Sequence, residues 1–258
     1  MQLSREVPDH LVKEVSQTEQ ICMEFARGVV FLALDNSRDP TFPRNHLLAC
    51  IADDFLETAV TLSIMAREGI HNACRRELRS LLEMSIKLAF VQQASVTSST
   101  EEKMTLFRRE LDSPNISLRK RINLSLLPEP QREPFCEHVG RLYGESSNYV
   151  HLTTIQVQRK LEQIDSGRKS GVETLEEVVA LNHEIHRNLA AAFVFVSHSV
   201  PSFAVGDLFL SPDGLSHIWQ LGTDKYIAYL DEHFDYKHER QSILYKVKEE
   251  RWSKVVDA

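Results

Sequence analysis

The stretch RLYGESSNYVH, from Arg141 to His151, indicates the fold together with an earlier stretch, RRELRSLLEMSIKLAFVQ, from Arg75 to Gln92. Both repeat apolar residues at helical spacing and set a few polar residues against the apolar faces. In the earlier stretch, Arg79 and Glu83 lie one helical turn apart at the edge of the apolar sector, so we expect both to be partly buried. A buried charge is costly unless it is paired. The two residues therefore predict either an ion pair that joins helices or a catalytic pair.

Long helical periods dominate the chain, which has only nine glycines and nine prolines in 258 residues. This pattern predicts an all-α protein, an antiparallel helical bundle. Gly69 separates two of the helices, which form either a hairpin or one kinked rod. We expect Pro128, Pro130 and Pro134 to delay the helix that follows them. The predicted helices span about 9–35, 44–68, 70–94, 135–150, 154–164 and 174–199, with two short helices between 101 and 123.

The character of the sequence changes after Pro201. The segments DLFL and LSHIWQL flank Ser211-Pro212-Asp213-Gly214, a turn sequence that predicts a β-hairpin. A charged helix at about 245–255 closes the chain. We therefore divide the chain into a bundle domain, 1–200, and a hairpin-plus-helix appendage, 201–258, that packs on the bundle or on a partner subunit. The acidic stretch 231–239 is predicted to be solvated.

Composition excludes several classes of function. The formal net charge is −7, with +4 over residues 66–170 and negative flanks, so bulk charge alone predicts no nucleic-acid binding, although basic pairs could contact phosphate locally. No apolar run approaches the roughly 20 residues of a membrane span, and the start MQLSREVPDH has no secretory core. These features predict a cytoplasmic protein that is not embedded in a membrane. The sequence shows no phosphate-binding glycine loop and no persuasive metal-ligand spacing, so we expect no metal and no cofactor.

Two further polar positions are candidates for a site. Asn182 and His186 lie four residues apart in the middle of an apolar helix face, where both need hydrogen-bond partners. They are either satisfied core groups or a binding or acid–base pair. His151 would fall outside the apolar stripe of its helix, so it belongs at the helix end, where it anchors a loop or forms part of a site.

The pairing of RRELRSLLEMSIKLAFVQ with YGESSNYVHLT resembles the HEPN superfamily of helical bundles, and is most similar to bacterial HEPN-like domains of unknown function. The resemblance covers about 44–195. It rests on a helix with an Arg…Glu pattern and a later helix that ends in a Ser-x-x-Val-His type of sequence. The resemblance implies a bundle that often forms homodimers. In active relatives it also implies metal-independent RNA cleavage in toxin or phage-defence systems.

Active relatives carry an arginine, four to six residues and then a histidine on one helix. Here the positions five to seven before His151 are Ser146, Glu145 and Gly144, so that arginine is missing. Arg141 lies about 15 Å further back along a helix and on another face. Arg132 and His138 have the required spacing, but Pro134 lies between them. An arginine of the earlier helix (Arg75, Arg76 or Arg79) could replace the missing one across the bundle or a dimer interface.

Three functions remain open. In the first, the chain is a non-catalytic HEPN-like scaffold or regulatory module, in which His151, Glu83, Arg79 and His186 form a structural polar network and the appendage serves assembly with a protein partner. In the second, it cleaves RNA, with His151 as general acid/base, an arginine that stabilises the transition state, and Asn148 or Ser147 on the ribose. In the third, Asn182 and His186 bind a small ligand.

Overall fold

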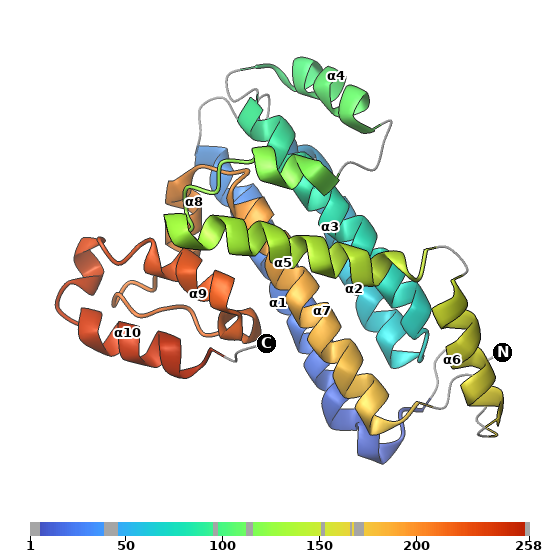
Figure 1. Cartoon of the computed structure of the whole chain (residues 1–258). Coiled ribbons are helices and arrows are strands. Elements are labelled where there is room, and N and C mark those ends of the chain that lie inside the picture. The colour runs from blue at the N-terminus through green and yellow to red at the C-terminus, as the bar shows by residue number, and fades with distance from the viewer. Residues whose placement is uncertain are drawn as a thin grey trace.

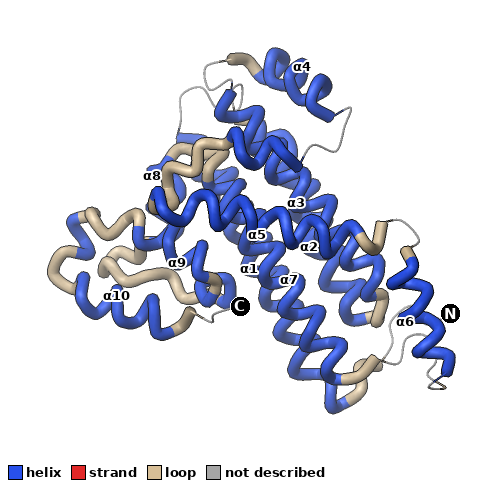
Figure 2. The backbone as a smooth tube through the Cα atoms, in the orientation of Figure 1, coloured by secondary structure: helices blue, strands red, loops and turns tan. Residues whose placement is uncertain are grey.

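A computed structural model describes residues 6–38, 46–94, 98–111, 116–150, 153–165, 167 and 173–255 of the chain. Over these residues the protein is helical, and one isolated β-bridge joins Leu210 to Ser216. The all-α prediction is confirmed, and Figure 2 shows helices and loops without a strand in the described part. Among the described residues, no helix is long and apolar enough to span a membrane.

Four long helices form the centre of the molecule and run along its length (Figure 1). Each carries a stripe of buried apolar residues at helical spacing, which is why it packs lengthwise against its neighbours. The helices α1 and α2 pack together, as do α3 and α7, and α1 also packs on α7. The four are α1 (Val12–Asp35), α2 (Leu47–Arg67), α3 (His71–Ala94) and α7 (Leu175–Ser197).

The second and third of these helices form a hairpin rather than one kinked rod. Gly69, between them, has φ +71°, a left-handed conformation that ends a helix and that glycine adopts without steric cost. The carboxylate of Glu173 lies where a Cβ on this glycine would be. Both the backbone conformation and the neighbouring side chain therefore favour glycine at this position.

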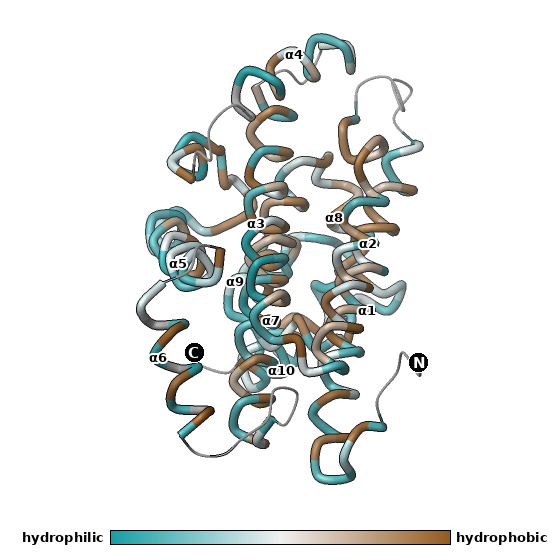
Figure 3. Tube along the Cα trace, turned by 90° about the vertical axis from the view of Figure 1, so that its right-hand side faces the viewer, coloured by the Kyte–Doolittle hydropathy of each residue, from teal (hydrophilic) through white to brown (hydrophobic). Residues whose placement is uncertain are grey.

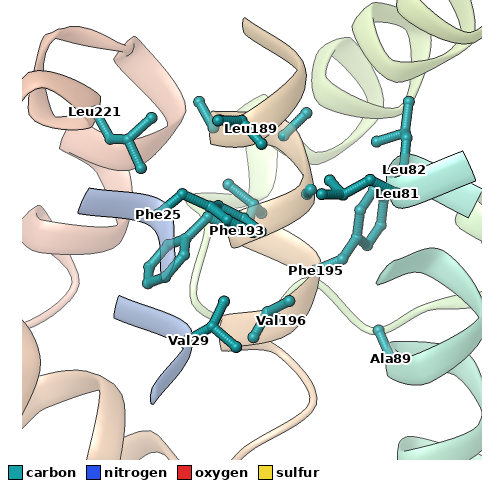
Figure 4. Packing of buried hydrophobic residues seen from close by; sticks show 14 of the residues in the cluster. Phe25, Val29, Leu81, Leu82, Ala89, Leu189, Phe193, Phe195, Val196 and Leu221 are labelled. Atoms are coloured by element: carbon teal, nitrogen blue, oxygen red, sulfur yellow. The ribbon is translucent and has the colours of Figure 1, made fainter. Parts of the chain in front are cut away.

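Aromatic side chains fill the centre of the bundle, as Figure 4 shows for Phe25 and Phe193. The Phe25 ring lies 6.3 Å from that of Phe55 and 6.2 Å from that of Phe193, centroid to centroid. Trp219, from the C-terminal segment, packs edge-on against Phe193 at 5.2 Å. The C-terminal segment thus contributes to the same hydrophobic core as the bundle.

The helix α5 (Glu129–Ser147) crosses α3 and α7 on the outside of the bundle (Figure 1). It begins six residues earlier than predicted, because Pro128 is its N-cap and Pro130 lies in its first turn, where a missing N–H breaks no helical hydrogen bond. Pro134 lies inside the helix, so the expectation that it delays the helix is wrong. Shorter helices complete this side: α4 (Thr100–Leu111), η3 (Ile116–Arg121) and α6 (Thr154–Asp165).

The predicted C-terminal β-hairpin is wrong. Its first arm is the helix α8 (Ser202–Phe209), because Ala204, Val205 and Phe209 bury themselves on one face against the core. The turn itself is predicted correctly: Gly214 has φ +80° and its N–H donates to the Ser211 carbonyl at 2.8 Å. Only the bridge at Leu210 and Ser216 resembles strand pairing. The chain then continues through η4 (Gln220–Thr223), α9 (Lys225–Glu232), η5 (His238–Arg240) and α10 (Leu244–Ser253).

Buried ion pairs hold this C-terminal part together. Asp231 is 4% exposed and forms ion pairs with Arg240, which is fully buried, and with Arg251. Asp235 lies 2.6 Å from the Arg251 guanidinium and 3.2 Å from that of Arg240. The expectation of a solvated acidic stretch is therefore wrong at these two aspartates, since they neutralise arginines that the sequence places further along the chain.

Candidate functional site

Two of the polar residues chosen from the sequence, Arg79 and Glu83, lie where α3 contacts α7, α5 and the turn after α5, a contact that we call the arginine–tyrosine seam. Two arginines of α3 each lie over a tyrosine ring: Arg79 over Tyr143 of α5, and Arg75 over Tyr149, just after α5 ends. Acidic side chains of α3 and α7 pair with cations of α3. The cation–ring distances are both 4.7 Å. The seam comprises Arg75, Arg79, Glu83, Lys87, Tyr143, Tyr149 and Glu184.

Arg79 and Glu83 share one partner on α5. The Arg79 guanidinium donates to the Tyr143 hydroxyl at 2.8 Å, and that hydroxyl lies 3.5 Å from a carboxylate oxygen of Glu83. The other oxygen of Glu83 accepts from the Lys87 ammonium at 2.6 Å. Both predicted residues are half-buried, as expected from their place at the edge of the apolar sector. Each has a protein partner.

Arg75 joins α3 to α7 with two parallel hydrogen bonds. Its Nε donates to Glu184 at 2.6 Å and its Nη2 donates to the other carboxylate oxygen at 3.0 Å. Burial alone would lower the pKa of this guanidinium, but the hydrogen bond and charge of Glu184 raise the pKa above its ordinary value. This two-pronged geometry is the strongest form of an arginine–carboxylate pair. Arg75 is 8% exposed, and no feature of the sequence predicts Glu184 as its partner.

The end of α5 holds two more predicted residues. The Ser147 hydroxyl donates to the Tyr143 carbonyl at 2.6 Å, a bond within the helix. Asn148 is the C-cap, and its carbonyl accepts from the Thr153 hydroxyl at 3.1 Å. The Asn148 side chain makes no hydrogen bond to any residue in the described ranges. His151 lies outside the described residues.

Asn182 is a buried link between α7 and α1. Its amide donates to the Glu14 carbonyl at 2.9 Å and to the Glu14 carboxylate at 3.1 Å, and its oxygen accepts from the Thr18 hydroxyl. It is 3% exposed. All three hydrogen bonds join helices, which is the arrangement expected of a satisfied core amide.

His186 lies elsewhere in the molecule and does not reach Arg79 or Glu83. Its Nε2 is 3.0 Å from the Gln220 carbonyl and 3.1 Å from the Thr223 hydroxyl, which itself donates to the same carbonyl at 2.8 Å. Nε2 therefore carries the proton and donates to both oxygens. This histidine holds η4 against α7, so the expected network does not join it to Arg79 and Glu83, which lie in the arginine–tyrosine seam.

The alternative pair Arg132 and His138 is not brought together as a site. Arg132 donates to the Leu127 carbonyl at 3.1 Å, whereas the His138 ring lies 5.4 Å from that of Tyr226 on α9. Burial and the nearby charges of Arg141, Arg187 and Lys225 lower the pKa of His138 to about 4. At neutral pH this imidazole is uncharged.

Comparisons with protein-family models, with curated proteins and with solved structures found no match to this chain. Among the described residues, no group of three or more His, Cys, Asp or Glu side chains is arranged to hold a metal ion.

Proposed function

We propose that the chain is a non-catalytic, HEPN-like helical scaffold or regulatory module, of the kind found in bacterial defence or toxin-type systems. The observation that carries this proposal is the arginine–tyrosine seam, in which the charged groups pair with one another across helices. A general acid or a charge stabiliser must be able to turn to a substrate. Arg75 and Glu83 instead have short, charged hydrogen bonds to protein partners.

The C-terminal part supports a role in assembly. It exposes large apolar side chains at its surface, and Ile218 and Tyr245 are each 81% exposed. Such residues are common at contacts between protein chains. We propose that they contact a second copy of the chain, which fits the homodimers that the HEPN resemblance implies. Light scattering after gel filtration should give the mass of a dimer, and a double variant, Ile218→Asp with Tyr245→Asp, should be monomeric. A monomeric wild type would contradict this part of the proposal.

One observation favours RNA cleavage as a second candidate. The Arg75 guanidinium lies over the ring of Tyr149, two residues before His151. An arginine of α3 thus reaches the region next to the histidine that the HEPN resemblance implies is catalytic. The side chain of Asn148, the residue before Tyr149, has no protein partner within the described ranges.

An RNA cleavage assay without metal separates the two candidates. The purified wild type, His151→Ala and a control, His238→Ala at an exposed position, would be incubated with single-stranded RNA in chelator, with folding checked by circular dichroism. The scaffold proposal predicts no cleavage above buffer by any of them. Cleavage by the wild type and the control, but not by His151→Ala, would contradict the scaffold proposal and support RNA cleavage.

A further inference from the structure

A pocket of about 490 Å³ lies between the end of α3 and the segment that follows η3. The pocket is open to solvent, its Arg121, Asn123 and Ser125 side chains are exposed, and its volume falls within the roughly 300–1,000 Å³ of small-molecule sites. The pocket is separate from the arginine–tyrosine seam, and its Arg121 belongs to one of the basic runs that the sequence suggests could contact phosphate locally. It is lined by Phe90, Gln93, Ala94, Arg121, Asn123 and Ser125.

The walls of the pocket are held in place by two side chains. The Gln93 amide accepts from Asn123 N–H at 2.8 Å and donates to the Asn123 carbonyl at 2.9 Å and to the His198 carbonyl at 3.0 Å. His198 in turn accepts from Leu126 N–H at 3.1 Å. Leu124 and Leu126 on this segment are buried in the core. The segment is therefore fixed before any ligand arrives, which lowers the cost of binding.

Unlike the Gln93 amide, three side chains of the pocket carry donors without a protein partner among the described residues. The Arg121 guanidinium lies over the Phe90 ring at 4.6 Å, and Phe90 is 6% exposed, so the stack fixes the position of the charge. This guanidinium makes no hydrogen bond or ion pair with any described residue, and the same holds for the side chains of Asn123 and Ser125. A stacked arginine keeps the donors at its edge free for an acceptor.

The charge around the pocket favours an anion. Residues 116–132 carry four cations and one acid, which is Glu129. Arg119 is not available, because it donates to the Cys136 and Ile116 carbonyls at 2.7 and 2.8 Å. Lys120 is exposed and has no ion pair among the described residues. Arg132 donates to the Leu127 carbonyl, so Arg121 is the cation that lines the pocket and can meet a ligand there.

We propose that this pocket binds a small molecule with a phosphate group, and that Arg121 is its main charge partner. A guanidinium binds two phosphate oxygens at once, and the Asn123 amide and the Ser125 hydroxyl supply further donors. The pocket is larger than a bare phosphate, so the rest of the ligand lies along the Phe90 side. This site goes beyond the proposed scaffold function and does not depend on it.

Isothermal titration calorimetry tests the proposal with two probes, inorganic pyrophosphate and AMP, at constant ionic strength. The proteins are the full-length wild type, Arg121→Gln and Arg76→Gln. Arg76 is exposed and lies near the opposite end of α3, so it is a matched control. We expect binding by the wild type and the control, and binding roughly 10- to 100-fold weaker in Arg121→Gln, as for the loss of a charged hydrogen bond.

The two probes distinguish what the site recognises. Binding of both would show that phosphate alone suffices, and binding of AMP alone would show that the pocket also contacts the rest of the molecule; either result, with loss in Arg121→Gln, supports the proposal. No binding of either probe to the folded wild type would overturn it. Equal binding by Arg121→Gln and the wild type would also overturn it, because the anion would then bind elsewhere.

Discussion

At the scale of single residues, the candidate site consists of side chains that satisfy one another. Tyr143 illustrates this, because its hydroxyl accepts from Arg79 and approaches Glu83. The sequence predicted that Arg79 and Glu83 would be half-buried and one turn apart. It gave no sign that a tyrosine about 60 residues later would join them, since periodicity identifies which face of a helix is buried but not which side chain lies opposite.

Replacement of Tyr143 by Phe should lower the free energy of unfolding by about 1–2 kcal/mol, because Arg79 loses a hydrogen-bond acceptor. Chemical denaturation followed by circular dichroism would measure the change. Tyr236→Phe, at a position that is 67% exposed, is the control and should change little. Equal stability of Tyr143→Phe and the wild type would show that the hydroxyl has no structural role.

His198 predicts a dependence of stability on pH. Burial lowers its pKa to about 4, and its Nδ1–H donates to the Val194 carbonyl at 2.7 Å, so the folded state holds it neutral. The unfolded histidine titrates near 6.5, so between pH 6.5 and 4 only the unfolded state takes up this proton. Stability is therefore full above about pH 6.5 and falls toward pH 4, by about 3 kcal/mol from this group.

Melting temperatures measured from pH 7.5 to pH 4 would test this expectation. His198→Gln should be less stable at neutral pH and should lose less stability on acidification than the wild type. His217→Gln, at an exposed position, should keep the slope of the wild type. If His198→Gln also kept that slope, other groups would cause the acid sensitivity.

At the scale of helices, the sequence predicts where a helix begins most accurately when a recognisable capping residue precedes it. Thr174 was expected at the start of a helix from 174, and it caps α7 through a capping box with Glu177. The start of α5 was predicted too late because its prolines were interpreted as breakers. The prediction of a β-hairpin is wrong because the four residues DLFL, taken alone, do not show that they extend the buried face of the helix α8.

Thr174→Ala should lower the free energy of unfolding by about 1 kcal/mol, since the Glu177 N–H loses its acceptor, which lies 3.3 Å away. Thermal denaturation would measure the loss. Thr105→Ala is the matched control, because Thr105 is an exposed threonine within α4, where alanine favours the helix. A loss of the same size in both variants would indicate that the cap contributes nothing specific.

At the scale of the whole molecule, the class of fold followed from periodicity, but the placement of the C-terminal part did not. Its core contact between Trp219 and Phe193 joins it to α7, and its buried Asp231 pairs with arginines 9 and 20 residues further along the chain, beyond the reach of helical periodicity. The tube of α6 has brown, hydrophobic segments in Figure 3. Its apolar residues Val157, Leu161 and Ile164 are 43%, 54% and 62% exposed. Helical spacing alone would have predicted that this stripe is buried.

Asp231→Asn should destabilise the C-terminal part by up to about 3 kcal/mol, because two buried arginines lose one of their two shared counter-charges and keep Asp235. Proteolysis under native conditions should then cut within residues 201–258 first. Glu239→Gln, an exposed acid on the same stretch, should leave both stability and the cleavage pattern unchanged. Resistance of Asp231→Asn to protease would contradict a structural role for the ion pairs.

The central claim is that the polar residues of the arginine–tyrosine seam hold the helices together, and a double-mutant cycle on Arg75 and Glu184 tests it most directly. The variants are Arg75→Gln, Glu184→Gln and both together, with the free energy of unfolding measured for each. The claim predicts that each single change costs about 1–3 kcal/mol and that the two couple by at least about 1 kcal/mol. Residues that are kept for activity at the expense of stability can be replaced without loss of stability. If the variants were as stable as the wild type, or more stable, and showed no coupling, the claim would be contradicted.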